Sequence, residues 1–209
     1  DAVLLCGGQA LRLRSVLPDG YPKIMADVNG TPFFDILRHK LISKGFRRFI
    51  ISTGYGHNIV MAYFLRACGN HDFGADIFTQ FSRDLTPLGT AGAIRQAGFV
   101  MGGANFWIFN GDTYCDVDYA AMLDYHLKSK SVITVAHDDR MRHVGTFVAS
   151  RRLIGLIPAA GGKHDMEELF TLLGSSHEPV GWFRTEAEYW DIGTPSGLEI
   201  FRKEEPWKK

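Results

Sequence analysis

A glycine-containing segment near the start of the chain could bind a phosphate group. It runs from Gly7 to Arg12, directly after the apolar stretch from Ala2 to Cys6. Small residues let backbone N–H groups approach an anion, and a helix start behind them favours negative charge. Arg12 can clamp phosphate with its forked donors. The segment therefore predicts a phosphate-binding loop, and the alternative is a plain strand-to-helix turn with surface arginines.

Two well-known phosphate loops are absent from the sequence. The pattern G-x-G-x-x-G would need glycines at the positions of Gln9 and Arg12. The Walker pattern would need Ser or Thr after Lys163, where His164 stands. Lys23, which follows the rigid Pro22, can reach the same phosphates as the first loop, and a solvated surface lysine is the alternative.

Two aspartates are candidate metal ligands. Asp112 follows the apolar run Phe106–Phe109, and a carboxylate at the carboxyl end of a buried parallel strand lies at the mouth of the ligand crevice. Mg²⁺ prefers one or two carboxylates together with phosphate oxygens and water. Asp191 stands among apolar residues, where an unpaired charge is costly unless it is paired or bound to a metal. The alternatives are a turn or N-cap role for Asp112 and a backbone-satisfied Asp191.

A run of small residues from Pro87 to Ala93 stands at a predicted helix start. Small side chains there let a flat ring or another backbone come close. The run is therefore a candidate nucleotide-base contact, and close helix packing is the alternative.

The elements that carry these segments alternate along the chain. Apolar runs alternate with amphipathic stretches, which indicates a mainly parallel sheet with helices on both faces and ligands bound at the carboxyl ends of the strands. The predicted strands are Ala2–Cys6, Phe49–Thr53, Ala75–Thr79, Phe106–Phe109, Val132–Ala136, His143–Ala149 and Leu153–Ile157, with strand-like pieces in Trp182–Ile192. The predicted helices are Pro32 to Gly45 with Thr31 as N-cap, His57–Ala67, Ala91–Gly98, Tyr119–Lys130, Asp165–Leu173, and Pro195 to Lys203 with Thr194 as N-cap.

Composition bounds the remaining possibilities. The chain has 209 residues, 45% of them hydrophobic, and its 23 basic and 23 acidic side chains balance, so it should fold as a single domain over residues 1–209 without a nucleic-acid partner. No apolar run approaches the roughly 20 residues of a membrane span, and no signal peptide precedes the first strand. Three scattered cysteines, Cys6, Cys68 and Cys115, argue against a disulfide framework. We therefore expect a cytoplasmic protein without a membrane partner.

The order of these motifs resembles the sugar-1-phosphate nucleotidylyltransferase family from about Ala2 to Phe201. Within the family the chain looks most like the guanylyltransferases for mannose 1-phosphate and D-glycero-D-manno-heptose 1-phosphate. Gly54-Tyr55, Pro87–Ala93 and Asn110–Asp118 carry that closer likeness. The resemblance implies an α/β, Rossmann-like fold of GT-A-like architecture, with a mostly parallel sheet flanked by helices.

The resemblance also implies a reaction and a role for each matching position. A sugar-1-phosphate oxygen would attack the α-phosphorus of a nucleoside triphosphate, most simply GTP, releasing pyrophosphate and forming a precursor of surface polysaccharide; a homo-oligomer is compatible with this. Mg²⁺ would be the cofactor, held by Asp112 and Asp191. Arg12, Lys23 and Asp112 would be the catalytic residues, Gly145 and Asp191 would contact the sugar, and the nucleotide would lie along Cys6, Gly7, Gly8, Arg12, Lys23, Leu88, Gly89, Thr90 and Asp112.

The chain departs from the family pattern at two places. Ala10 and Leu11 replace the second Gly and the Thr of the family loop, and a methyl at position 10 obstructs close approach if that residue needs a positive φ. The family's Glu-Lys pair and Asn-x-Gly-x-Tyr stretch are not found between Gly145 and Asp191. Either the sugar site is reduced, or stretches of the natural chain are absent from this sequence, as the start at Asp1 without Met suggests.

Three rival functions stay open from the sequence. One is a nucleotidylyltransferase that uses UTP, CTP or dTTP. Another is a glycosyltransferase that uses Asp116 and Asp118 as a metal-binding D-x-D motif. The last is a non-catalytic relative that binds nucleotide-sugars.

Overall fold

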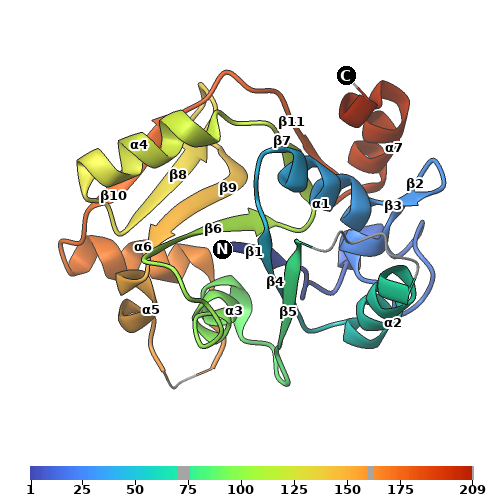
Figure 1. The fold of residues 1–209 in the computed structure, drawn as a ribbon, viewed down its shortest axis with the longest axis horizontal. Helices are drawn as coiled ribbons and strands as arrows, with labels where there is room; N and C mark the ends of the chain where they lie inside the picture. Colours follow the sequence, from blue (N-terminus) through green and yellow to red (C-terminus); the bar gives the residue numbers. More distant parts are fainter. Residues whose placement is uncertain (70–75, 160–161, 209) are drawn as a thin grey trace.

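The computed structural model describes residues 1–69, 76–159 and 162–208, and these residues form a central sheet of seven strands (Figure 1). Neighbouring strands are parallel except at β9, which is antiparallel to both β6 and β8. The predicted mostly parallel sheet is thus confirmed. Across the sheet the order is β10 (Val180–Arg184), β8 (Ile133–His137), β9 (His143–Ser150), β6 (Asn105–Asn110), β1 (Ala2–Leu5), β4 (Arg48–Thr53) and β5 (Phe78–Arg83).

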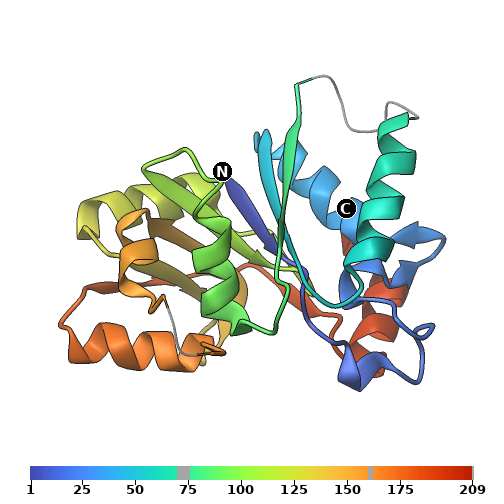
Figure 2. The same cartoon turned by 90° about the horizontal axis from the view of Figure 1, so that it is seen from below.

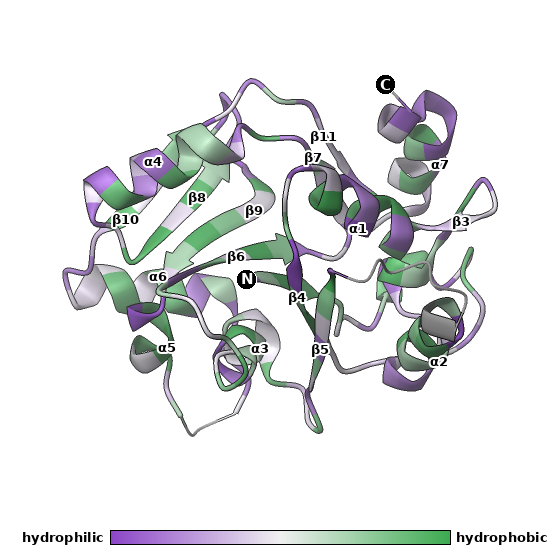
Figure 3. Ribbon diagram, viewed as in Figure 1, coloured by the Kyte–Doolittle hydropathy of each residue, from purple (hydrophilic) through white to green (hydrophobic). Residues whose placement is uncertain are grey.

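Helices cover both faces of the sheet, as the sequence predicts. Alternate residues of the buried strands enter two separate apolar cores, so that Leu4 belongs to one and Val3 to the other. Figure 3 shows this apolar character along the central strands. One core includes α1 (Phe33–Ser43), α2 (His57–Gly69), α4 (Tyr119–Ser129) and α7 (Pro195–Glu204); the other includes α3 (Gly89–Ala97), α5 (Arg152–Leu156) and α6 (Met166–Ser175).

The strand register brings several loops to one edge of the sheet. Leu5, at the end of β1, pairs with Ser52 of β4 on one side and with Asn110 of β6 on the other. Because the strands run in the same direction, the segments that follow them begin side by side, and Figure 2 shows these ends from below. The predicted phosphate loop and Asp112 therefore start from neighbouring strands.

Two short ribbons complete the fold. The first joins β2 (Asp27–Val28) to β3 (Thr31–Pro32) just before α1. The second joins β7 (Thr113–Cys115) to β11 (Tyr189–Asp191) in antiparallel register, with Asp191 opposite Thr113. The second ribbon carries the distant Asp191 back to the segment that follows β6.

Some predicted boundaries are wrong for identifiable reasons. Thr31 and Pro32 lie in β3, so Pro32 is the N-cap of α1 rather than its first residue. Leu153–Ile157, predicted as a strand, is mostly α5, because a five-residue apolar run cannot distinguish strand from helix by its period. The strand predicted from Ala75 begins at Phe78, and Ala75 itself lies outside the described residues. Thr194 caps α7 and Pro195 begins it, as predicted.

None of the helices within the described ranges combines the length and the apolarity that crossing a membrane requires.

Candidate active site

The predicted phosphate loop leaves β1 at a point where only a glycine fits easily. The Gly7 carbonyl accepts a hydrogen bond from the Tyr55 N–H at 3.3 Å, which holds the loop against the turn after β4. A Cβ on Gly7 would lie 3.2 Å from the backbone nitrogen of Gly54, closer than most such contacts. The two backbones therefore touch because neither residue has a side chain at that point.

Cys6 precedes this loop but faces away from it. Its side chain is buried in the apolar core, and its Sγ lies 3.4 Å from the Leu4 carbonyl. Burial, together with the charge of Asp112, raises the pKa of the thiol. Cys6 can therefore offer only backbone atoms to a nucleotide. Cys6 and Cys115 are free thiols, and the Cys68 side chain lies outside the described part of the chain.

Ala10 adopts a left-handed backbone conformation, so the condition raised from the sequence for this position is met. Its φ is 53° and its ψ is 31°, immediately before the short 3₁₀ helix Leu11–Leu13. A residue with a Cβ is strained there, and the Ala10 methyl is buried. The loop thus keeps the bend that a glycine would give, at some cost in backbone strain.

Arg12, Asp112 and Asp191 meet around one point at the crevice. A Cβ built on Gly193 would lie 3.1 Å from Arg12 Nη2, 3.2 Å from Asp112 Oδ2 and 2.8 Å from Asp191 Oδ1. Asp112 Oδ2 and Asp191 Oδ1 are therefore at most about 6 Å apart. Segments separated widely along the chain supply two acids and one guanidinium to a single small volume, and the missing side chain of Gly193 keeps it open.

Lys23 joins the same cluster from the other side. It begins the 3₁₀ helix Lys23–Met25, and its Nζ forms an ion pair with Asp112 Oδ2. A Cβ on Gly8 would lie 3.3 Å from Lys23 Cε, so the lysine crosses directly over the glycine loop. The side chains of Lys23 and Asp112 are 25% and 17% exposed, which leaves them partly accessible to a ligand.

Asp191 is more open than its apolar neighbours in the sequence suggest. The residue is exposed, and Ile192 and Gly193 after it are buried. The Gly193 N–H donates a hydrogen bond to Asp191 Oδ1 at 2.7 Å, which fixes the carboxylate beside the point described above. Its charge is tolerated because it faces solvent and the crevice rather than the core.

The acids of this cluster fit a magnesium ion. Mg²⁺ takes hard oxygen ligands and usually retains water and substrate phosphate alongside one or two carboxylates. Asp112 and Asp191 supply those two carboxylates at one point. Across the described ranges no group of three or more His, Cys, Asp or Glu side chains gathers as a metal-binding set.

Leu88, Gly89 and Thr90 lie at the beginning of α3, beyond the end of β5. They are half-buried, and β1 and β4 separate β5, the strand before them, from β6, the strand before Asp112. The His164 N–H donates to the Leu88 carbonyl at 2.7 Å and so braces this segment.

Asp84 was not singled out from the sequence, yet it stands between these two groups. It follows β5, its N–H donates to the Thr53 carbonyl at 2.7 Å, and its Cβ lies 3.7 Å from a Cβ built on Gly54. Its Oδ1 is buried without a hydrogen-bond partner, and desolvation raises the pKa of Asp84 to about 6. The available signal was weaker than for Asp112, because β5 mixes polar and apolar residues and is only half-buried.

Gly145 has a positive φ of 71° and packs against the second ribbon. A Cβ there would lie 2.7 Å from the Thr113 Cβ, a distance that real contacts essentially never show. Gly145 therefore holds the start of β9 against β7, and β7 pairs with β11, the strand that carries Asp191. The two predicted sugar contacts are thus connected through β7.

The D-x-D pair has structural partners outside the crevice. Asp116 forms an exposed ion pair with Lys44 at 2.7 Å. Asp118 is the N-cap of α4 and accepts a hydrogen bond from the Ala121 N–H at 2.9 Å. These contacts account for both acids without a metal ion.

Comparison with known proteins gives consistent matches. A family model described as nucleotidyl transferase matches residues 1–145. A D-glycero-alpha-D-manno-heptose 1-phosphate guanylyltransferase from Aneurinibacillus thermoaerophilus is 38% identical over 136 residues, which cover 65% of this chain and 56% of that protein. A mannose-1-phosphate guanylyltransferase from Mycobacterium tuberculosis is 26% identical over 226 residues, covering 93% of this chain and 61% of that protein. The chain therefore spans little more than half the length of these curated relatives.

Solved structures agree with the fold. HddC from Yersinia pseudotuberculosis, complexed with GMP-PN, superposes with a TM-score of 0.79 and 26% identity, and the match covers 98% of both chains. A UDP-glucose pyrophosphorylase matches with a TM-score of 0.80 at 15% identity, which shows a shared fold alone.

Proposed function

The chain belongs to the nucleotidyl transferase family, and we propose that it transfers a guanylyl group from GTP to a manno-configured sugar 1-phosphate, either heptose or mannose, with release of pyrophosphate. The observation that carries this proposal is the convergence of Arg12, Asp112 and Asp191 on one point, beside Lys23. The names of the relatives support the choice of base and sugar.

The arrangement suits a reaction between two phosphate groups. The attacking oxygen of a sugar 1-phosphate is already anionic, so the protein needs no general base. The protein must instead align two phosphate groups that repel each other and neutralise their negative charge. Arg12 and Lys23 are the cations that do this, and the backbone of Gly7 and Gly8 lets the nucleotide lie close to them.

Asp112 and Asp191 would hold Mg²⁺. The ion would supply Lewis-acid polarisation of phosphate oxygens and screen their charge. In the chain itself, the Lys23 ammonium pairs with Asp112 and lies over Gly8. Lys23 therefore keeps a positive charge beside Asp112 at the position where the phosphates would lie.

Asp84 supports guanine as the base. An ionised carboxylate only accepts hydrogen bonds, and guanine presents two adjacent donors, N1–H and the N2 amino group. Uracil and thymine present a single N–H between two carbonyl oxygens, and an aspartate carboxylate would repel those oxygens. The buried, unpartnered Asp84 Oδ1 lies next to the Gly54 turn that touches the nucleotide loop, so a base bound there would satisfy it.

The test is a panel of the four nucleoside triphosphates against mannose, heptose, glucose and N-acetylhexosamine 1-phosphates, followed by pyrophosphate release. We expect GTP with a manno-configured phosphate to give the highest kcat/KM. Asp84→Asn should reduce GTP use about tenfold, since it replaces a charged acceptor with an amide. Asp76→Asn is the matched control, because Asp76 lies before the other end of β5 in an exposed ion pair with Arg47.

Other outcomes of the panel identify the rivals. A preference for UTP, CTP or dTTP would reject the guanine assignment but keep the reaction. Binding of nucleotide-sugar without turnover of any triphosphate would indicate a non-catalytic relative. Sugar transfer to an acceptor without pyrophosphate release would indicate a glycosyltransferase.

A further inference from the structure

The tight turn between β8 and β9 stands where the sugar-facing half of the crevice begins. It consists of residues 138–142, between His137 at the end of β8 and His143 at the start of β9. Asp138 organises it, since its Oδ1 accepts hydrogen bonds from the backbone N–H groups of Arg140 at 3.0 Å and Arg142 at 2.9 Å. A single carboxylate therefore fixes the backbone of the whole turn.

The same carboxylate also fixes one side chain. Arg142 Nε lies 2.8 Å and Arg142 Nη2 lies 2.7 Å from Asp138 Oδ2. Arginine has five N–H donors, so this contact uses only part of the guanidinium. The Arg142 side chain is nevertheless 58% exposed. The turn thus holds the Arg142 guanidinium in one position at the surface, with part of it exposed to solvent.

Arg142 lies over the strand that carries Asp191. The centre of its guanidinium is 5.8 Å from the centroid of the Tyr189 ring. Tyr189 and Asp191 are two residues apart in β11 and therefore face the same side, about 7 Å apart along the strand. That side also carries Thr113, which Gly145 touches. Arg142 thus lies beside Tyr189 on the strand that also carries Asp191.

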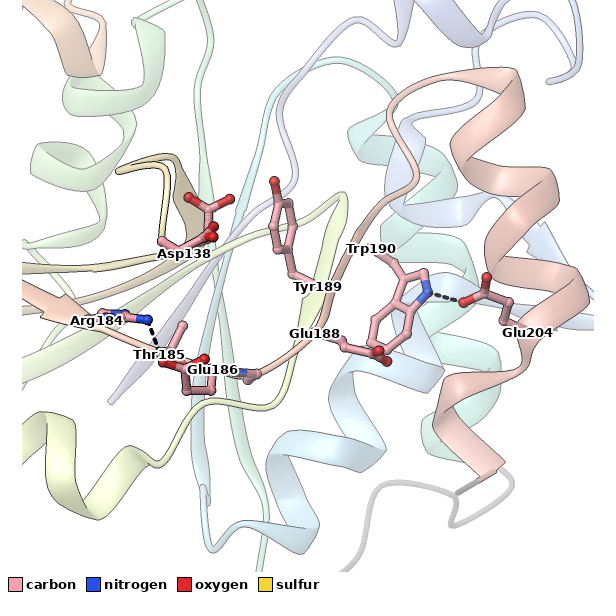
Figure 4. A pocket seen from close by; sticks show the side chains of 10 residues that line it. Asp138, Arg184, Thr185, Glu186, Glu188, Tyr189, Trp190 and Glu204 are labelled. Atoms are coloured by element: carbon pink, nitrogen blue, oxygen red, sulfur yellow. Dashed lines mark hydrogen bonds and ion pairs between the residues drawn. The ribbon is translucent and has the colours of Figure 1, made fainter.

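A groove opens beside this pair (Figure 4). Its volume is about 460 Å³, and it is lined by Asp138 and Tyr189, the two partners of Arg142, together with acids that include Asp139 and Glu188. Figure 4 shows Asp138 and Tyr189 rising on the same side of the link between β10 and β11. The guanidinium that lines the groove is that of Arg184, and Arg142 borders the groove through its contacts with Asp138 and Tyr189. Aromatic, carboxylate and guanidinium groups together suit a polyol, because hydroxyl groups both donate and accept hydrogen bonds. The acids would repel a second phosphate.

We propose that Arg142, oriented by Asp138 and Tyr189, binds the sugar ring of the sugar 1-phosphate through its hydroxyl oxygens and so determines sugar specificity. This inference rests on the proposed function. Asp138 is a positioning residue, because it acts through Arg142.

The experiment compares Arg142→Met with Arg140→Met on the same turn, using pyrophosphate release with each substrate varied in turn. Arg142→Met should raise KM for the sugar 1-phosphate about tenfold, as expected when charged hydrogen bonds are lost, and should leave KM for GTP within about twofold. Asp138→Asn should raise the same KM by a smaller factor. Arg140→Met should change neither KM, since Arg140 meets Asp138 only through its backbone in the contacts above.

Thermal unfolding separates binding from a merely structural role. Arg142→Lys keeps the ion pair with Asp138 but loses the fork, so it should unfold at the wild-type temperature and still show the raised sugar KM. Unchanged sugar KM in both Arg142 variants, or an equal rise in both substrates' KM, would overturn the inference while leaving the reaction intact. A wild-type protein that releases no pyrophosphate would overturn the proposed function and this inference together.

Discussion

The proposed nucleotide side and the proposed sugar side of the crevice are built in different ways. On the nucleotide side, the Gly7 loop, Asp84 and Asp112 each follow a parallel strand, and the sheet register alone brings them to one edge. On the sugar side, Asp191 and Gly145 come from a three-residue strand and from the reversed strand β9, and they meet only because β7 pairs with β11. One side depends on strand ends, whereas the other depends on contacts between distant segments.

This difference predicts how strongly amino-acid substitutions should disturb the geometry of each side. A side chain at the end of a central strand stays in place as long as the sheet forms, because the sheet is the most buried part of the fold. On the sugar side, Asp191 lies on a three-residue strand and Asp138 lies in a turn, so single residues such as Gly145 and Asp138 hold more of its geometry. Substitutions should therefore alter chemistry on the nucleotide side and both chemistry and local structure on the sugar side.

The largest expected effect tests whether the two sides share one site. Asp112→Asn and Asp191→Asn should each reduce kcat about a thousandfold, since each removes a charge that the transition state requires. Both proteins should keep the wild-type unfolding temperature. Asp116→Asn is the control, because Asp116 forms a surface ion pair with Lys44 and should leave kcat unchanged. Near wild-type turnover by Asp191→Asn would show that the second ribbon carries no essential acid, and turnover lost with Asp116→Asn would favour the D-x-D reading.

The next effect tests the dependence of the sugar side on one close contact. The methyl of Gly145→Ala would press against Thr113, at a residue whose φ is positive. Gly30 also has a positive φ, 88°, but a Cβ there would meet no atom within 4 Å, so Gly30→Ala is the control. We expect Gly30→Ala to lower the free energy of unfolding by about 1 kcal/mol and Gly145→Ala by roughly 3 kcal/mol. Urea unfolding of both variants measures the difference. Equal losses would mean that the contact with Thr113 adds nothing to the backbone strain.

The sequence predicted the two sides to different extents, for the same reason. The strand before Gly7 and the strand before Asp112 are apolar runs with clear ends, and a local pattern of that kind locates both the strand and the polar residue after it. The convergence of Arg12 and Lys23 on Asp112 depends on the path of the chain after β1, since both residues lie in short 3₁₀ helices beyond the strand. Asp84 was missed because a lone acid after a strand that is only half-buried carries little local signal.

The helix α5, elsewhere in the fold, and the sugar side could not be worked out in the same way. Nothing local to Leu153–Ile157 distinguishes a short helix from a strand, and its packing against Gly98 of the preceding helix region comes from a segment far away in the chain. The pairing of Asp191 with Thr113 likewise requires tertiary structure. The role proposed for Arg142 depends on a turn whose geometry Asp138 sets, and no sequence motif indicates that role.

A pH experiment sharpens the assignment of Asp84 on the nucleotide side. Desolvation raises the pKa of Asp84 to about 6. The folded protein therefore holds this proton more tightly than the unfolded chain, so the contribution of Asp84 to stability falls as pH rises from the ordinary aspartate range through about 6. Guanine binding needs the ionised form, so KM for GTP should fall about tenfold between about pH 5 and pH 7. Asp84→Asn should remove this pH dependence, and Asp76→Asn should keep it; a profile unaffected by Asp84→Asn would exclude Asp84 from base binding.

The smallest expected effect concerns the strained loop at Ala10. A left-handed alanine costs about 1–2 kcal/mol, but a glycine costs about 0.5–1 kcal/mol more chain entropy on folding, so the two contributions oppose each other. Ala10→Gly should therefore raise the free energy of unfolding by less than about 1 kcal/mol. Ala93→Gly, at a buried position within α3, should lower it by about that amount, because no strain is relieved there. Since the two changes remove the same methyl group, opposite signs in urea unfolding would identify backbone strain at Ala10, and a loss in both would mean that the buried methyl contributes more by packing than the strain costs.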